Sequence, residues 1–182
     1  MTVGGDSIRE KVDAGAYRDA VTLCCREHGA ALGRFCMALL GSQAEAEEAA
    51  QEALLAAYRA MTSYRGESSV RAWLFGIAKK VCARRLAQRG RRGERLRLVQ
   101  GSGEERASSP EEALGRRRRA ERIREALDTL KPTEREAVLL RYQAGLSHRE
   151  VAEACGIDEA AARKRSSRAL GRLRALLADE VL

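Results

Sequence analysis

Near the C-terminal end of the chain, four cations stand at helical spacing, and these side chains are the best suited to contact a polyanion. They are Arg163, Lys164, Arg165 and Arg168. On a helix lying in the major groove of DNA, Arg and Lys pair with guanine edges or hold backbone phosphates. The segment therefore predicts DNA-binding chemistry. The alternative is an ordinary helical hairpin with a solvated basic face.

The residues before the basic segment predict a turn that would present it. Ser147 and Glu150 have the spacing of a capping box, so a short helix should begin there, with His148 in its first turn. Gly156 can end that helix in a left-handed turn, and Asp158 can cap the next helix. Small and apolar residues stand where the two helices would cross: Val151, Cys155, Ile157 and Ala162. The pattern is that of a helix-turn-helix.

Apolar spacing along the rest of the chain predicts an all-α fold with no strands. Helices are expected over about 16–40 and 43–61, and from Ser68 or Ser69 to Leu86. A second helical block starts near Ile123 and includes a capping box from Thr133 to Glu136, after Pro132. The expected organisation is a flexible N-terminus (1–15), a helical domain (16–90), a flexible linker rich in Gly, Ser, Arg and Glu (91–118) and a second small helical domain (119–182).

Composition favours a nucleic-acid partner. The chain has 182 residues and a formal net charge of +8, with its Arg residues clustered, which favours binding to polyanions. An anionic membrane surface is the alternative. No apolar stretch approaches the roughly 20 residues that span a bilayer, so no membrane insertion is expected. The segment Met1–Gly15 lacks the apolar core of a secretory signal, which predicts a cytoplasmic protein.

The residues of the usual enzyme sites are sparse. The chain has 2 His, namely His28 and His148, and neither a phosphate-binding glycine loop nor a nucleophile motif is present. We therefore expect no enzyme activity, cofactor or small-molecule substrate. The 5 Cys contain no C-x-x-C pair, so reduced, mostly buried thiols and no metal site are expected. A loose metal site formed by Cys24, Cys25 and His28 is the less favoured alternative.

Three motifs in this order resemble the extracytoplasmic-function sigma factors of the sigma-70 family, which are promoter-recognition subunits of bacterial RNA polymerase. Residues 45–54 are similar to the polymerase-binding helix, and residues 64–78 to the loop and helix that read the minus-ten element. Residues 130–173 are similar to the domain that reads the minus-thirty-five element. The resemblance implies a non-enzymatic alternative sigma factor in a stress or envelope response, with core polymerase, promoter DNA and an anti-sigma factor as partners.

The resemblance also implies roles for individual residues. The polymerase-binding residues would be Glu47, Glu48, Gln51 and Glu52. Those that contact minus-ten DNA would be Tyr64, Arg65, Ser69, Trp73, Lys79, Lys80 and Arg84. Those that contact minus-thirty-five DNA would be Ser147, His148, Arg163, Lys164, Arg165 and Arg168.

The sequence departs from the family at several of these positions. Lys80 and Arg84 replace the Asn and Asp found in many members, and the small Ala49 and Ala50 replace larger aliphatic residues. Two further hypotheses therefore stay open. One is a free-standing helix-turn-helix regulator that binds an operator without polymerase. The other is a sigma-like adaptor that has lost promoter opening and sequesters a protein partner.

Overall fold

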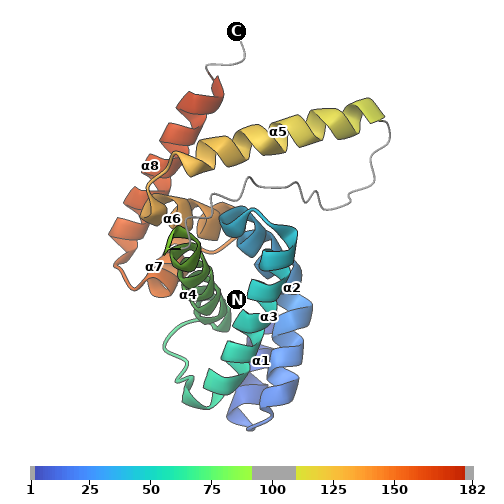
Figure 1. The fold of residues 1–182 in the computed structure, drawn as a ribbon. Coiled ribbons are helices and arrows are strands. Elements are labelled where there is room, and N and C mark those ends of the chain that lie inside the picture. Colours follow the sequence, from blue (N-terminus) through green and yellow to red (C-terminus); the bar gives the residue numbers. More distant parts are fainter. Residues whose placement is uncertain (1–2, 92–109, 179–182) are drawn as a thin grey trace.

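The computed structural model describes residues 3–91 and 110–178, which form helices joined by short loops (Figure 1). No strand occurs within these two ranges. The N-terminal domain contains α1 (Val3–Asp13), α2 (Tyr17–Leu40), α3 (Gln43–Ala60), the 3-10 turn η1 (Met61–Ser63) and α4 (Val70–Arg91). The C-terminal domain contains α5 (Pro110–Asp128), α6 (Pro132–Tyr142), α7 (His148–Cys155) and α8 (Glu159–Ala178). The all-α fold in two helical domains is confirmed.

In the N-terminal domain, α2 and α3 form a hairpin against which α4 packs. Phe35 of α2 and Phe75 of α4 meet edge to face at its centre, with ring centroids 5.6 Å apart, a favoured aromatic geometry. The face that α3 buries consists of alanines: Ala46, Ala49, Ala53 and Ala57. Side chains this small bring the helix backbones close together, so the domain is held by the larger residues of α2 and α4.

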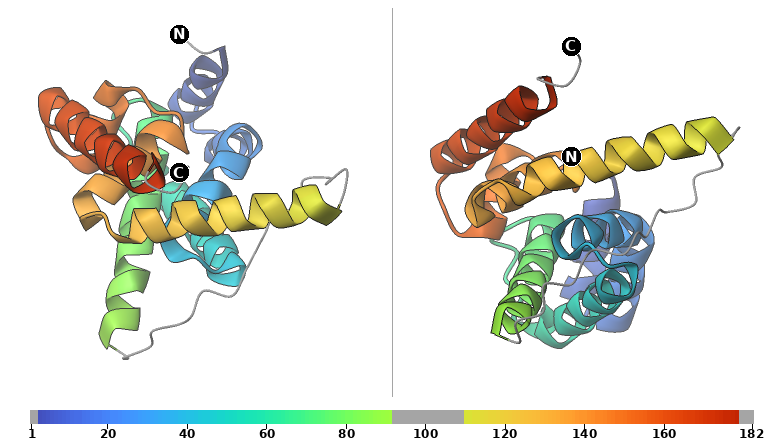
Figure 2. Two further views of the ribbon diagram at one scale, coloured as in Figure 1. Left: turned by 90° about the horizontal axis from the view of Figure 1, so that it is seen from above. Right: turned by 45° about the horizontal axis from the view of Figure 1, so that its top comes forward.

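The C-terminal domain is built around α6, α7 and α8, with α5 lying across α8 (Figure 2). Leu140, Leu146 and Val151 are fully buried at its centre. Ala162 and Ala169 of α8 are also buried, so one face of that helix packs inward over its N-terminal half. The opposite face of α8 is left for solvent or a partner.

Two helices occupy segments for which flexibility was expected. Helix α1 lies in the expected flexible N-terminus, because Ile8 and Val12 enter the core and the Arg9 guanidinium donates to the carbonyl of Gly66 at 3.2 Å. Over residues 7–13, where burial along α1 is described, only Ile8 and Val12 are buried, which is too few to give a helical pattern in the sequence. Helix α5 begins at Pro110, inside the expected linker 91–118. Residues 92–109 of that linker lie outside the described ranges.

The capping box expected from Thr133 to Glu136 is wrong. Helix α6 already begins at Pro132, which stands at its first position with Lys131 as the N-cap residue, and no side chain bonds there. Proline fits this position because its fixed φ suits a helix and its missing N–H would have had no partner. Glu136 instead lies 3.7 Å from the ammonium of Lys79 on α4.

Helices α4 and α7 bring the two domains into contact (Figures 1 and 2). At Gly76 of α4, a Cβ atom would lie 3.4 Å from the carbonyl oxygen of Ala154 on α7. Arg135 of α6 also donates to the carbonyl of Ala38 in α2 at 2.7 Å. In the described ranges, none of the helices combines the length and hydropathy of a bilayer-spanning segment.

Candidate nucleic-acid interface

The helix-turn-helix has the local geometry that its sequence predicts. The amide of Glu150 donates to the Ser147 hydroxyl at 3.1 Å, and the amide of Ser147 donates to the Glu150 carboxylate at 2.8 Å. Gly156 takes the left-handed conformation with φ of 65°. The Asp158 carboxylate accepts the amide of Ala161 at 2.7 Å, so α8 also starts with a cap. The capping box, the glycine turn and the second cap are confirmed.

The outer face of α8 is basic and open. Arg163, Lys164 and Arg168 are exposed, and Arg165 is half-buried. Arg163 forms an ion pair at 2.9 Å with Glu159, one turn earlier. The sequence-predicted cations therefore share one helix, and most of them are free to meet a polyanion.

Ser147 and His148 lie at the start of α7. The Ser147 hydroxyl is exposed but already accepts the capping bond. Burial, together with the positive charges of Arg141 and Arg163, lowers the pKa of His148. At neutral pH the imidazole is therefore neutral, and it can offer a hydrogen bond but no cation.

The loop before α4 is held in one conformation by a ring contact and by hydrogen bonds. The rings of Tyr64 and Trp73 pack at 5.0 Å between centroids, and the Tyr64 hydroxyl donates to the carbonyl of Ser68. The Ser69 hydroxyl accepts the amide of Ala72 at 3.1 Å and so caps α4. Gly66 has φ of 71°, a conformation that glycine adopts at little cost. Tyr64 of the loop and Trp73 of α4 thus form a pair of adjacent rings beside a fixed loop backbone.

The cations expected to accompany this loop are placed in different ways. Arg65 and Lys80 are exposed. Lys79 is only 17% exposed and faces Glu136 of the C-terminal domain. Arg84 pairs with Glu52 of α3. Of these cations, Arg65 and Lys80 are the most accessible to DNA in this conformation.

The acidic face of α3 divides into two rows. Glu48 and Glu52 turn toward α4, where Arg85 donates to them at 2.9 and 3.2 Å. Glu47 and Gln51 are exposed. Because Arg85 and Arg84 partly neutralise the first row, the freer polar groups belong to the second.

Two large side chains on α3 differ from the sequence expectation: Leu55 was not singled out, and Tyr58 was expected in the inward apolar stripe with the alanines. Leu55 is 57% exposed and Tyr58 is 47% exposed, although both are large and hydrophobic. They follow Gln51 at spacings of four and seven residues, so they continue its row along the helix. The signal was present in that spacing, but the burial pattern of the alanines was needed to show which side of α3 faces outward.

Comparisons with known proteins match both domains. Residues 25–92 match the family profile of Sigma-70 region 2, and residues 120–173 match that of Sigma-70, region 4. The ECF RNA polymerase sigma factor SigL of Mycobacterium tuberculosis is 32% identical over 159 residues, which cover 84% of this chain and 86% of SigL. This chain belongs to the extracytoplasmic-function sigma factors.

Other relatives of this chain are also RNA polymerase sigma factors. EcfG of Rhodopseudomonas palustris is 32% identical over 148 residues, covering 80% of this chain and 78% of that protein. The sigma-H factor of Pseudomonas aeruginosa is 33% identical over 116 residues, which cover 59% of this chain and 60% of that factor.

Two solved structures share the fold. CnrH, solved with the cytosolic domain of CnrY, superposes with a TM-score of 0.72 at 21% identity, over 97% of this chain and 99% of CnrH. The sigma factor RpoE of Bartonella quintana, solved with the anti-sigma factor NepR, has a TM-score of 0.66 at 27% identity, over 82% of this chain and 91% of RpoE.

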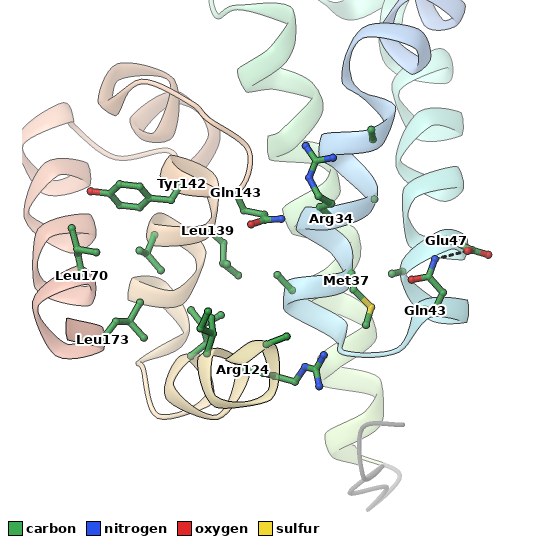
Figure 3. A pocket seen from close by; sticks show the side chains of 18 residues that line it. Arg34, Met37, Gln43, Glu47, Arg124, Leu139, Tyr142, Gln143, Leu170 and Leu173 are labelled. Carbon is green, nitrogen blue, oxygen red and sulfur yellow. Dashed lines mark hydrogen bonds between the residues drawn. The ribbon is translucent and has the colours of Figure 1, made fainter. Parts of the chain in front are cut away.

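In this sigma factor a groove of about 640 Å³ lies between the two domains (Figure 3). Met37 and Arg34 of α2 stand on one side, and Leu139 and Leu173 of α6 and α8 on the other. Tyr142, also on its lining, is exposed. The groove is mainly apolar and is built by both domains together.

The cysteines lie mostly inside the helical packing. Cys24, Cys36 and Cys82 are buried, whereas Cys25 is exposed. Burial and the nearby Glu27 carboxylate raise the pKa of the Cys24 thiol to about 11, so it stays protonated. Among the described residues, no group of three or more His, Cys, Asp and Glu side chains is placed to hold a metal ion.

Proposed function

We propose that this sigma factor binds core RNA polymerase through the outward row of α3, reads the minus-ten element with residues 64–69 and the start of α4, and reads the minus-thirty-five element with α8. The observation that carries the proposal is the basic helix α8, which is capped, exposed and preceded by a complete helix-turn-helix turn. The same chain also carries a loop residue, Tyr64, whose ring packs at a tilt against that of Trp73 on α4.

The polymerase-binding surface is proposed to consist of Glu47, Gln51, Leu55 and Tyr58. A charged rim beside apolar side chains is typical of protein interfaces, in which aromatic residues supply much of the affinity. Glu48 and Glu52 lie next to this row, and their Arg partners on α4 reduce the negative charge that they offer. In this proposal they fix α4 against α3 as well as border the interface.

The minus-ten loop is proposed to hold a base that leaves the stack when DNA opens. Unstacking a base costs a few kcal/mol, which an aromatic pocket can recover. Tyr64 and Trp73 provide that surface, and Arg65 and Lys80 are placed to neutralise phosphates on either side.

The interdomain groove is proposed as the docking site of the anti-sigma partner. An amphipathic helix laid in an apolar groove is a common mode of recognition. The groove offers Met37, Leu139 and Leu173 for its apolar face and Arg34 and Arg124 for acidic groups at its edge. The complex of RpoE with NepR supports a partner of this kind. A protein with these roles acts in the cytoplasm beside the polymerase and has no catalytic activity of its own.

The proposal is tested by run-off transcription from genomic fragments with the cognate core polymerase and the purified full chain. We expect discrete new transcripts that depend on this protein. Arg168→Ala should weaken them through minus-thirty-five binding, and Tyr58→Ala should weaken them through core binding. Arg174→Ala, which removes an exposed cation near the end of the same α8, is the matched control.

The outcomes separate the three hypotheses. Transcripts that never form, together with specific binding of the free protein to duplex DNA, would favour a free-standing regulator. Tight core binding without promoter opening would favour an adaptor. Transcripts that persist in Tyr58→Ala with unchanged core affinity would remove the apolar row from the polymerase interface.

A further inference from the structure

A row of ion pairs, here named the ladder, joins α3 to the end of α4. Its members line one polar crevice: Glu45, Glu48, Glu52, Arg84, Arg85 and Arg89. Arg85 uses all three guanidinium nitrogens, because Nη1 donates to Glu48 at 2.9 Å while Nε and Nη2 donate to Glu52 at 3.2 and 3.1 Å. The other oxygen of Glu52 pairs with Arg84. The pairs are therefore linked into a network and are not isolated contacts.

Arg89 forms the last step of the ladder. Its Nε donates to one oxygen of Glu45 at 3.0 Å, and its Nη2 pairs with the other oxygen, so the contact is a two-pronged fork. Its Nη1 donates at 2.8 Å to the carbonyl of Leu40, at the end of α2, where helix carbonyls lack partners within the helix. Forked contacts within a network are the ion pairs that contribute most to stability.

The last two turns of α4 depend on the ladder, because the apolar packing of the helix ends before them. Cys82 is buried, but beyond it the side chains of residues 83–90 are all exposed or half-buried. The facing helix α3 buries only alanines, whose short side chains give few ridges to fix the register of a neighbouring helix. The ion pairs, and not the apolar core, therefore hold the end of α4 in place.

The cations of these turns divide into an outer and an inner pair. Lys80 is exposed, and Arg84 stands one turn later on the same face and is exposed as well. The side chains of Arg85 and Arg89 are only 23% and 15% exposed and lie toward the carboxylates of α3. The outer pair is placed to meet a polyanion, whereas the inner pair is placed to hold the helix.

We propose that Arg85 and Arg89 are positioning residues for promoter recognition. Paired with the carboxylates of α3, they fix the end of α4 so that Lys80 and Arg84 meet minus-ten DNA, and they do not themselves hold phosphates. The inference rests on the proposed function, which assigns the start of α4 to that DNA. Hydrogen bonds weaken steeply outside a narrow range of distance and angle, so a small shift of α4 is enough to lose them.

The test centres on Glu45→Gln, because charge and position predict opposite results for it. Removing a negative charge near bound DNA should strengthen binding if only the electrostatic field mattered. Positioning predicts the reverse, since Arg89 loses its partner and the end of α4 is released. We expect the holoenzyme to bind promoter DNA about fivefold more weakly, as when one base-reading side chain is lost. Arg89→Gln should have a similar effect, and the double variant no larger one, because both residues act through one pair.

Binding is measured by fluorescence anisotropy with the full chain, saturating cognate core polymerase and a labelled duplex of the promoter that run-off transcription recovers. Titrations at several salt concentrations separate the inner cations from the outer ones. Loss of a phosphate contact lowers the salt slope by about one, as expected for Lys80→Ala, whereas Arg89→Gln should leave the slope unchanged. Arg89→Lys keeps the charge but loses the fork, so it should weaken binding as Arg89→Gln does.

Two controls accompany these titrations. Glu125→Gln removes an exposed carboxylate from α5, outside the ladder, and should leave promoter affinity unchanged. The affinity of each variant for core polymerase, measured without DNA, should equal that of wild type. Circular dichroism verifies that helix content is retained.

Three results would overturn the positioning role. Unchanged or tighter promoter binding by Glu45→Gln would show that the ladder does not position α4. Weaker core binding by Glu45→Gln would place that carboxylate in the polymerase interface. A lower salt slope in Arg89→Gln would make Arg89 a phosphate contact.

Failure of the proposed function has a different signature. If no transcripts form with wild-type protein, or if Lys80→Ala leaves both promoter affinity and salt slope unchanged, α4 does not read the promoter, and the positioning role is lost with it. Transcripts and a Lys80 effect that persist while Glu45→Gln binds normally would instead remove the positioning role alone.

Discussion

The two surfaces proposed to read DNA in this sigma factor differ in how they are built. Helix α8 is specified by neighbours in sequence, because its caps and turn lie within about twenty residues, and its basic face is exposed. The proposed minus-ten surface is assembled from a loop, from α4 and from Arg9 of α1, and it is bounded by carboxylates of the other domain. A surface that depends on residues close in sequence, such as the outer face of α8, is exposed as soon as its helix forms. A surface assembled from distant segments depends on how those segments pack, and its accessibility depends on the same packing.

The largest effect should come from breaking the core under the assembled surface. Phe75→Ala removes the edge-to-face partner of Phe35 and should lower the free energy of unfolding by about 3–5 kcal/mol. Urea unfolding followed by Trp73 fluorescence measures this change. Leu86→Ala, at an exposed position on the same helix, should change it little. Equal effects of the two substitutions would contradict the central role of the Phe35 and Phe75 pair.

The locally specified surface is tested by Arg168→Ala. Loss of this exposed cation should weaken holoenzyme binding to minus-thirty-five DNA by about 1–3 kcal/mol if the side chain contacts a base. Fluorescence anisotropy with a labelled promoter duplex measures the affinity, and Arg174→Ala serves as the control. An unchanged affinity would move the reading face to the other side of α8.

Glu150 links the two surfaces, since it caps α7 and also accepts a bond from Ser69. Burial opposes its ionisation, but bonds from the Ser147 amide and from the hydroxyls of Ser69 and Ser147 prevail and lower its pKa below the ordinary 4.5. A depressed folded-state pKa stabilises the fold above about pH 4.5, and this stabilisation disappears as pH falls through the folded-state pKa.

The free energy of unfolding of wild type should therefore exceed that of Glu150→Gln by its largest margin at neutral pH. This margin should decrease as the pH falls below about 4.5. Ser147→Ala, which removes the other half of the box, should cost about 1 kcal/mol. Thermal unfolding at several pH values measures both. A difference that is independent of pH would show that the Glu150 charge contributes nothing to the cap or to the domain contact.

The smallest effect is expected at Lys80, which is exposed on α4. Lys80→Ala should reduce the salt dependence of promoter binding by about one phosphate contact, uniformly across sequences. Titrations of holoenzyme at several salt concentrations measure this slope, with Lys131→Ala as a control. A sequence-dependent change would instead assign Lys80 a role in reading bases, in place of the Asn or Asp of related proteins.

Much of the local structure was predictable. The Ser147 and Glu150 box, the Gly156 turn and the Asp158 cap follow from backbone groups satisfied within a few residues. The predicted box at Thr133 failed because α6 begins at Pro132, so that Lys131 and not Thr133 is the N-cap residue. Helix α1 was missed because its stability comes from burying Ile8 and Val12 where it packs on α2 and α4.

The sequence by itself determined the all-α fold, the two domains, the helix-turn-helix and the basic face of α8. Each of these depends on periodicity, caps and charge within a short stretch of chain. Only the tertiary structure decided that Glu48 and Glu52 meet Arg85, that Leu55 and Tyr58 stay exposed, and that Ser69 meets Glu150. These contacts join residues 33 to 81 positions apart or depend on which helix face is buried, and no local spacing specifies either.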